Sequence, residues 1–256
     1  MLRPLASLAA LAFAATATPS LADEKSYLAE YQVTLRGLPV ASARFESTFS
    51  KDGFHVDGRV SSTGIATLFD RTRANAKVAG SVDAAGVRPR TFTNRYSSGG
   101  KKGSTVIKYR GDTVHSTVNE PETRRGKNWV PVPAGELTGV FDPISSTLIR
   151  ASGPDEICNR TIRFFDGELR GDLKLSHRGQ QQVEGFKEPA IACNARFVPV
   201  GGYRKGRKQI EYMKEKSRIT IAFAKLGDTG FYTPVDTSIG TQAGTLRITA
   251  KRIRAR

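Results

Sequence analysis

The chain has 256 residues and a formal net charge of +16, from 40 lysines and arginines against 24 aspartates and glutamates. This length is ample for one domain with a substantial hydrophobic core. No apolar run after residue 22 is long enough for a membrane-spanning helix, so we expect no transmembrane segment in the mature protein.

The first 22 residues have the features of a secretory signal peptide. Arg3 supplies a positive charge, residues 5–17 form an apolar run too short to span a bilayer, and residues 20–22 fit a small-x-small cleavage site. A buried N-terminal helix is the alternative, but the run ends in the polar stretch TPS and has no polar face. We predict cleavage after Ala22, export to the periplasm, and a single β-rich domain over residues 23–256.

Period-2 alternation of apolar and polar residues dominates the remaining chain. Each alternating set predicts a strand with one buried face, and the buried positions include Tyr27, Ala29, Tyr31, Val33, Phe45, Phe49, Phe54, Val56, Ile107, Cys193, Ile221 and Ile248. Turn signals separate the sets, as at residues 36–39, 51–53, 110–112 and 165–167. Many strands at regular spacing predict a mainly β fold, with one strongly curved antiparallel sheet that forms an open or half barrel or a β-spiral.

One segment breaks the alternation. An apolar stripe with helical spacing is formed by Leu137, Val140, Phe141, Ile144 and Leu148. Asp142-Pro143 interrupts this stripe, because proline lacks a backbone donor and fits best as the first residue of a helix capped by the preceding aspartate. We predict two short helical pieces, or one kinked helix, packed in the concavity of the sheet. The segment is either a plug that covers the core or a lid over a ligand cavity.

Two other segments also lie outside the strand pattern. Residues 65–69 predict a turn of helix or a corner, with Leu68 and Phe69 buried. Residues 119–133 predict a loop, because prolines and glycine punctuate a basic run that contains Trp129, the only tryptophan.

The chain has two cysteines, Cys158 and Cys193. In an exported protein, such a pair predicts one disulfide. The chain-entropy model credits closure of the intervening loop with about 3–4 kcal/mol. A nucleophilic Cys158 is the alternative, but no histidine is close in sequence to lower its thiol pKa.

An acidic group lies in and beside the stretch RFFDGELRG, at Asp166, Glu168 and Asp172. A catalytic pair of carboxylates, as in glycosidases, is one interpretation. The alternative is a two-residue hairpin turn at Asp166-Gly167, since Asp-Gly suits a turn with positive φ at both positions. The carboxylates then face outward beside Arg163 and Arg170, where no desolvation raises their pKa. We expect the acids to be exposed and predict no catalytic residue.

Metal and nucleotide sites lack their signatures. The three histidines, His55, His115 and His177, lie far apart, and the chain has no Cys-x-x-Cys motif. Gly201 and Gly206 have the spacing of a phosphate-binding loop, but the required Lys followed by Ser or Thr is absent. We predict no metal and no cofactor.

The positive charge is spread along the chain and is denser in a few short runs. Outside the cytoplasm the available anions are lipid headgroups, lipopolysaccharide phosphates and acidic envelope proteins, and export removes nucleic acid as a partner. The best candidate for an anion-contacting loop contains Arg204, Lys205, Arg207 and Lys208. The alternative is a solvated turn with solubilising charges.

Several long stretches carry a family resemblance, namely YQVTLRGLPVASARFESTF, SSTGIATLFDRTRANAKVAG, WVPV ahead of DPIS, CNRTIRFFDGELRGDLKLS, CNARFVPVGGYRKG and AKLGDTGFYTPVDTSIGTQAGTLRITA. Together they resemble the domain of unknown function 3108 family of alphaproteobacterial periplasmic proteins. The resemblance implies an exported β-rich domain, distantly related to the lipoprotein-carrier fold and to β-spiral envelope-integrity proteins, with helices packed in the mouth of a half barrel. It implies no catalytic residue, and it matches Cys158 and Cys193 to cysteines of the family.

The expected function is that of a non-enzymatic cell-envelope protein that binds a lipid-like ligand or an envelope partner. The candidate apolar ligand-lining or core residues are Phe45, Phe49, Val56, Phe141 and Leu148. A hydrolase acting on envelope glycan or lipid, and a basic interaction module without a small-molecule ligand, are the alternatives.

Overall fold

The structure is a computed structural model that describes residues 24–64, 66–69 and 71–256. The predicted signal peptide and its cleavage site after Ala22 lie outside the described residues.

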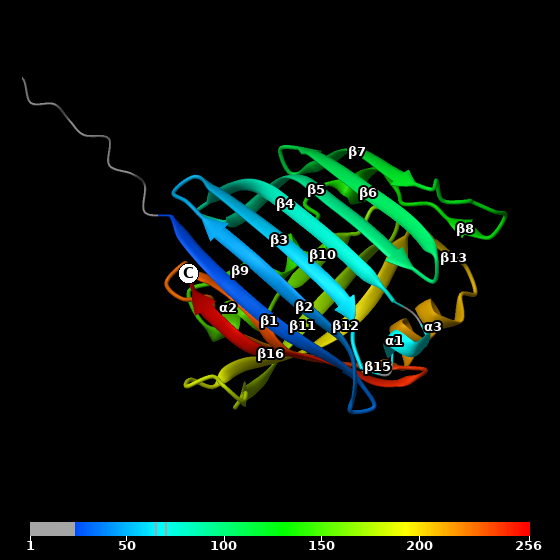
Figure 1. The fold of residues 1–256 in the computed structure, drawn as a ribbon. Coiled ribbons are helices and arrows are strands. Elements are labelled where there is room, and N and C mark those ends of the chain that lie inside the picture. The colour runs from blue at the N-terminus through cyan, green and yellow to red at the C-terminus, as the bar shows by residue number, and fades with distance from the viewer. Residues whose placement is uncertain (1–23, 65, 70) are drawn as a thin grey trace, which may run out of the picture.

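A single antiparallel sheet of fourteen strands makes up most of the molecule and curves strongly into an open barrel (Figure 1). Its strands are β1 (Lys25–Leu35), β2 (Leu38–Phe49), β3 (Gly53–Ser62), β4 (Arg73–Asp83), β5 (Gly86–Ser98), β6 (Lys101–Arg110), β7 (Thr113–Glu120), β9 (Ile149–Arg150), β10 (Thr161–Phe165), β11 (Arg170–Gln181), β12 (Ala190–Gly201), β14 (Ile219–Lys225), β15 (Phe231–Thr241) and β16 (Gly244–Ala255). The predicted mainly β, curved antiparallel fold is confirmed.

The strand order brings the first and last strands together, because β16 pairs with β1. The path runs β10-β11-β12-β14-β15-β16-β1-β2-β3-β4-β5-β6-β7. Strand β1 therefore lies between β2 and β16, the last strand of the chain. The path ends at β10 and β7, and these two edges are not paired with each other. A separate two-stranded ladder joins β8 (Trp129–Val130), within the predicted loop 119–133, to β13 (Tyr203–Arg204).

Helices are few and short. They are α1 (Ala66–Phe69), α2 (Pro154–Cys158), α3 (Lys208–Glu215) and the 3-10 turns η1 (Ala134–Leu137) and η2 (Ser145–Thr147). α1 agrees with the helical turn predicted over residues 65–69, whereas Ile65 and the side chains of Leu68 and Phe69 lie outside the described part. A single kinked helix over residues 137–148 is the wrong alternative, because this region contains two short 3-10 turns joined by an extended stretch.

The extended stretch joins the two open edges of the sheet. Thr138 bridges to Thr113 of β7, and Phe141 bridges in parallel to Phe164 of β10. The Phe141 N–H donates to Arg163 O at 2.9 Å, and Phe165 N–H donates to Phe141 O at 2.8 Å. We call residues 136–141 the seam segment. Its backbone groups form hydrogen bonds with the two strand edges, in place of the hydrogen bonds within a helix that the sequence predicted.

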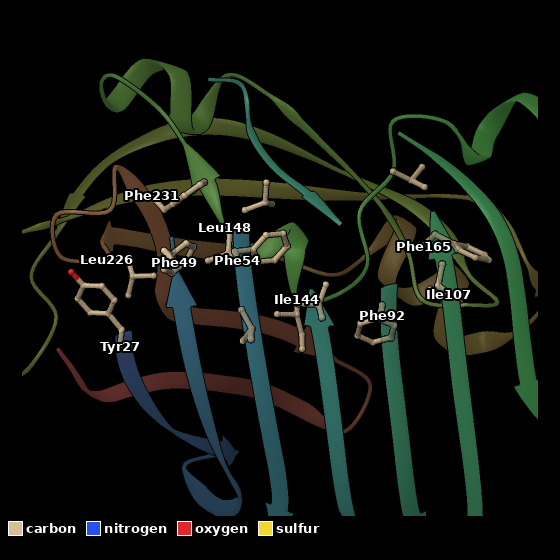
Figure 2. Packing of buried hydrophobic residues seen from close by; sticks show 14 residues of the cluster. Tyr27, Phe49, Phe54, Phe92, Ile107, Ile144, Leu148, Phe165, Leu226 and Phe231 are labelled. Carbon is tan, nitrogen blue, oxygen red and sulfur yellow. The ribbon is translucent and has the colours of Figure 1, made fainter. Parts of the chain in front are cut away.

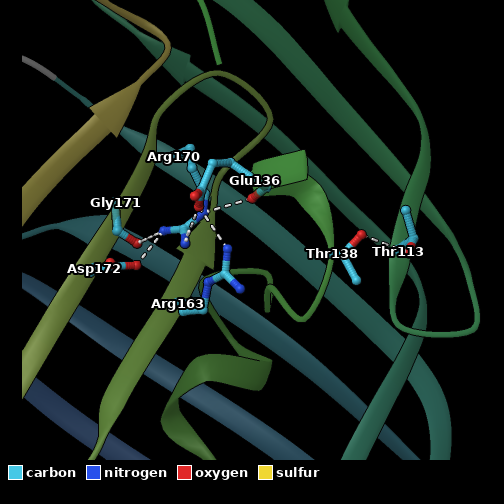
Figure 3. Close-up of polar contacts among 7 residues, drawn as sticks. All are labelled: Thr113, Glu136, Thr138, Arg163, Arg170, Gly171 and Asp172. Atoms are coloured by element: carbon cyan, nitrogen blue, oxygen red, sulfur yellow. Dashed lines mark hydrogen bonds and ion pairs between the residues drawn. The ribbon is translucent and has the colours of Figure 1, made fainter. Parts of the chain in front are cut away.

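Charged side chains hold the seam segment to the β10–β11 hairpin (Figure 3). Arg170 is fully buried and makes ion pairs with Glu136 at 3.1 Å and with Asp172 at 2.6 Å. Arg163, on the neighbouring strand, pairs with the same Glu136 carboxylate at 2.6 Å. A buried guanidinium is costly unless it is paired, and here the carboxylates of Glu136 in the seam segment and of Asp172 on β11 compensate it.

The β10–β11 turn differs from the predicted two-residue turn. Four residues, 166–169, connect Phe165 to its cross-strand partner Arg170. The Asp166 carboxylate accepts the N–H groups of Glu168 and Leu169 at 2.9 and 2.8 Å, which makes it a side-chain cap of a wider turn. Gly167 is buried with φ +104°, and a Cβ there would collide with Thr105 of β6. The tip of this turn packs against the opposite edge of the sheet, where Asn119 of β7 donates to Gly167 O at 2.9 Å.

Two large hydrophobic clusters fill the ends of the interior. The first lies under β2–β6 and includes Phe49, Phe54, Phe92 and Ile144, with the Phe49 ring stacked on Phe231 at 5.2 Å (Figure 2). The second lies between β10–β14 and the helices α2 and α3. Within it, Cys158 at the end of α2 forms the predicted disulfide with Cys193 of β12, across an S–S distance of 2.01 Å. The bond therefore ties α2, immediately before β10, to the sheet.

Candidate functional site: an apolar cavity in the curved sheet

The concave face of the sheet contains an apolar cavity of about 540 Å³. Its walls come from β1–β5 and β14–β16, and residues 143–148 cross one side of it. The wall is mainly aliphatic, as shown by Val33, Ala43, Val60, Ala76, Ile221 and Ile248. No charged side chain is among the described residues that line the cavity. A cavity of this size and polarity matches typical small-molecule sites.

Small residues in register keep this part of the interior empty. Ala43, Val60 and Ala74 lie side by side on β2, β3 and β4, and all three line the cavity. The next inward row contains Gly58 and Ala76. Inward positions repeat every second residue along a strand, so these side chains are neighbours on one continuous area of the wall. Because most of them are small, the space in front of this area stays open.

Gly58 has a specific steric role in the wall. A Cβ at Gly58 would lie 2.6 Å from the Phe45 ring, so only glycine lets this ring lie along the sheet. The Phe45 ring also meets Tyr31 edge to face, with centroids 5.8 Å apart. The aromatic pair therefore forms part of the wall without filling the cavity.

Residues 143–148 are fixed in place by the chemistry that the sequence predicted for Asp142. One carboxylate oxygen of Asp142 accepts the N–H groups of Ile144 and Ser145 at 2.9 and 3.0 Å. This turn places Pro143, Ile144 and Leu148 against the cavity. The segment is both a plug and a cavity wall, since Ile144 and Leu148 also belong to the first hydrophobic cluster.

Asp142 is fully buried, and its second carboxylate oxygen has no hydrogen-bond partner among the described residues. The same holds for the Ser145 hydroxyl and the Tyr109 hydroxyl, which comes from β6. Burial raises the pKa of Asp142 above its ordinary value, and burial together with nearby Asp142 raises the pKa of Tyr109. The neutral carboxyl is therefore the form that the fold favours.

The wall is polar at only a few points. The Tyr31 hydroxyl donates to Pro234 O at 3.0 Å, and burial of the phenol raises the pKa of Tyr31 to about 12. Ser47 and Asn94 also line the cavity. One signal in the sequence points to Asn94, because this residue interrupts the alternating apolar positions of β5 between Phe92 and Tyr96.

The predicted apolar residues separate into two groups. Phe45, Val56 and Leu148 line the cavity. Phe49 lies in the first hydrophobic cluster, and Phe141 packs against this cluster from the seam segment. Both phenylalanines therefore contribute to the core beside the cavity.

The predicted basic loop lies at one end of the barrel. Arg204, Lys205, Arg207 and Lys208 are all exposed and lead into α3. α3 contacts β15 and β12 and lies just before β14 in the chain. At this end of the sheet, cross-strand partners form one row across β14, β15, β16 and β1, namely Ile219, Ile239, Leu246 and Leu35. We call this end, with the β1–β2 and β15–β16 turns, the rim (Figure 1). The next inward row, Ile221, Thr237, Ile248 and Val33, lines the cavity.

The acidic group lies away from the cavity. Asp166 is exposed as expected, but the expectation that no desolvation acts on it was wrong, because burial raises its pKa. Glu168 and Asp172 are half-buried. Glu168 accepts a hydrogen bond from Thr123 at 3.0 Å, and Asp172 pairs with Arg170. The expectation of exposure was wrong for two of the three acids, because Glu168 lies at the hairpin tip that packs against the opposite sheet edge, and Asp172 pairs with the buried Arg170. None of the three lines the cavity.

The remaining candidates for chemistry lie apart on the surface. His55, His115 and His177 are exposed on three different strands. Within residues 24–64, 66–69 and 71–256, no group of three or more His, Cys, Asp or Glu side chains is arranged to hold a metal ion. In the same ranges, no helix has the length and apolar character needed to span a bilayer.

Comparison with known families identifies the chain. Residues 30–251 match the family described as "Protein of unknown function (DUF3108)". The chain belongs to the DUF3108 family. The resemblance seen in its sequence motifs is confirmed, and no curated protein matches the DUF3108 chain.

Among solved structures, this DUF3108 protein is similar to a chain from Brucella abortus titled as a beta-barrel-like protein of domain of unknown function DUF1849. The two share 11% sequence identity, with a TM-score of 0.49, over 91% of this chain and 98% of that chain.

Proposed function

We propose that this DUF3108 protein is a non-enzymatic, periplasmic binding protein that holds the apolar part of a lipid-like molecule in the cavity. The observation that carries the proposal is an interior space of about 540 Å³ whose described lining contains no charged side chain. Well-packed cores leave few voids larger than a water molecule, so a space of this size needs a reason. Burial of apolar ligand surface would supply the binding free energy.

Export is the second part of the proposal. The Cys158–Cys193 disulfide supports it, because structural disulfides persist mainly in oxidising compartments. The signal-like residues 1–22 of the sequence point the same way.

Contact with an anionic membrane surface is the third part of the proposal. Arg204, Lys205, Arg207 and Lys208 are exposed and lead into α3, which contacts β12 and β15 of the sheet. Each well-placed cation adds about 1 kcal/mol of attraction to an anionic bilayer. These cations would hold the protein near a membrane surface that supplies or receives the ligand.

Titration with an apolar fluorophore that brightens outside water tests the binding proposal. We expect saturable binding of one fluorophore per chain, with displacement by long-chain lipids or alcohols. Fluorescence that rises without saturation, or no displacement, would remove the binding function.

Sedimentation with vesicles tests the membrane contact separately. We expect binding to anionic vesicles that weakens as salt is added, because screening reduces surface attraction. A variant with Arg204, Lys205, Arg207 and Lys208 changed to glutamine should bind these vesicles less and the fluorophore equally. Equal vesicle binding by this variant and the wild type would refute the assigned role of the four cations.

A further inference from the structure

The cavity wall contains one side-chain amide, that of Asn94 on β5. The register places Asn94 beside Ala76 of β4, and through Ala76 in the row of Gly58 and Phe45. Asn94 therefore points to the same side of the sheet as three residues that line the cavity. Its position is half-buried.

No side chain or backbone group of the described residues forms a hydrogen bond with the Asn94 amide. The neighbouring polar residues on this row are engaged elsewhere. Thr105 of β6 donates to Asn119 Oδ1 at 2.8 Å, and Asn119 Nδ2 donates to Gly167 O at 2.9 Å across the seam. Asn94 is thus the member of this polar row whose donors and acceptor stay available to the cavity.

The other polar groups of the cavity wall have fewer hydrogen-bond donors and acceptors available to a ligand. Tyr31 donates to Pro234 O, and Thr147 donates to Ile144 O at 2.7 Å. Ser47, Thr233 and Thr237 present single hydroxyls. The Asn94 amide combines two donors with an acceptor, so it is suited to a hydroxyl or a carbonyl of a ligand.

The wall also disfavours a charged group inside the cavity. No lysine or arginine is among the described lining residues, and the Tyr31 phenol is neutral over the physiological range because its pKa is about 12. An ionised carboxylate or phosphate would lose its hydration there without gaining a counter-charge. The part of a ligand that enters the cavity is therefore uncharged.

We infer that the cavity binds a neutral amphipathic molecule, an apolar body that carries one hydroxyl or carbonyl group, and that Asn94 selects this group. The inference rests on the proposed binding function and adds a ligand class to it. A site whose polar group is left unpaired by the wrong ligand discriminates against that ligand. Asn94 is here a specificity-determining residue that contacts the ligand.

The test compares dodecanol with dodecane as competitors of a bound apolar fluorophore, in the wild type and in Asn94→Leu. The alkane measures the apolar cavity alone and reports whether the variant is folded. We expect the variant to lose about tenfold in dodecanol affinity, the scale of one hydrogen bond, while its dodecane affinity stays equal or rises. Asn75→Leu, an exposed position on β4, is the matched control and should behave as the wild type.

Three results would contradict the role of Asn94, the exclusion of charged ligands or the binding function itself. Equal dodecanol affinity in the wild type and Asn94→Leu would show that the amide holds only water, and it would overturn this inference alone. Dodecanoate that binds the wild type as tightly as dodecanol at neutral pH would overturn the exclusion of charge. Failure of the wild type to bind the fluorophore would overturn the proposed function, and this inference with it.

Discussion

Two regions of the interior of the barrel have opposite packing. Between β10–β14 and the helices α2 and α3, large side chains such as Phe197 and Phe223 are buried, and a disulfide ties α2 to the sheet. Between β1–β5 and residues 143–148, inward positions hold Ala43, Ala74 and Ala76, and the space stays open. Both regions show the same period-2 alternation. Alternation therefore predicts which side chains point inward, whereas the volume of these side chains determines whether the space between them is filled.

The seam segment joins the sheet edges β7 and β10, which do not pair with each other as strands. Packing and the disulfide stabilise the filled region. Polar contacts at Arg170 hold the seam, and Asp142 positions the segment that crosses the cavity. Mutations in each place should separate stability from binding.

The largest effect is expected at Arg170. Arg170→Met should lower the free energy of unfolding by about 3–5 kcal/mol, because it leaves Glu136 and Asp172 without their buried partner. Arg163→Met removes a half-exposed cation from the same Glu136 and should cost at most about 1 kcal/mol. Urea unfolding of both variants measures the difference. Similar losses in the two variants would contradict a special role for the buried guanidinium.

Loss of the disulfide should be next in size. Replacing Cys158 and Cys193 together by alanine should lower the free energy of unfolding by about 3 kcal/mol, since the bond closes a loop with a sequence separation of 35. Chemical denaturation measures this loss. Fluorophore affinity of the folded variant should stay near that of the wild type, because the bond lies in the filled region. A folded variant that no longer binds would show that the two regions are not independent.

Filling the cavity should remove binding with a smaller effect on stability. Ala76→Phe places a ring in the cavity and should weaken fluorophore binding by at least about tenfold, or 1.4 kcal/mol. Ala79→Phe is the matched control, because Ala79 lies on the same strand and is exposed. Fluorescence titration of both variants checks this. Equal fluorophore affinity of the two variants would contradict the assignment of the binding site to the cavity.

The smallest effect is expected at Asp142. Because burial raises its folded-state pKa, the stability due to this carboxyl is complete below the unfolded-state pKa and is lost as pH rises through the folded-state pKa. Asp142→Asn keeps the oxygen that accepts the Ile144 and Ser145 N–H groups and cannot ionise. It should raise the free energy of unfolding at neutral pH by about 1 kcal/mol.

Unfolding measured from acid to neutral pH checks the sign. The difference between the wild type and Asp142→Asn should grow as pH rises, whereas Asp52→Asn, at an exposed acid, should show no such trend. A difference that shrinks with rising pH would mean that the ionised carboxylate is the stabilising form.

Much of the fold was predictable because the signals were local. Alternation marked Phe45 and Val56 as inward, and two cysteines in a chain with signal-like residues indicated the disulfide. The seam was not predictable in this way. The spacing of Leu137, Val140 and Phe141 suits a helix, yet an extended segment that packs between two distant sheet edges also buries apolar residues.

The buried ion pairs of the seam and the cavity were predictable only in part. The burial of Arg170 has no local signal, since arginines are rarely buried unless paired, and its partner Glu136 lies 34 residues away in sequence. The cavity itself depends on which small residues share a row across β2, β3 and β4, and single-strand patterns do not give the register between strands.

Native mass spectrometry is the sharpest test of the proposal that the cavity holds a ligand. We expect that protein purified without detergent carries a neutral lipid-like molecule, or takes up one equivalent of dodecanol, and that Ala79→Phe does the same. Ala76→Phe should show only the mass of the bare chain. Equal ligand occupancy in Ala76→Phe and the wild type would contradict the claim that the cavity is the binding site.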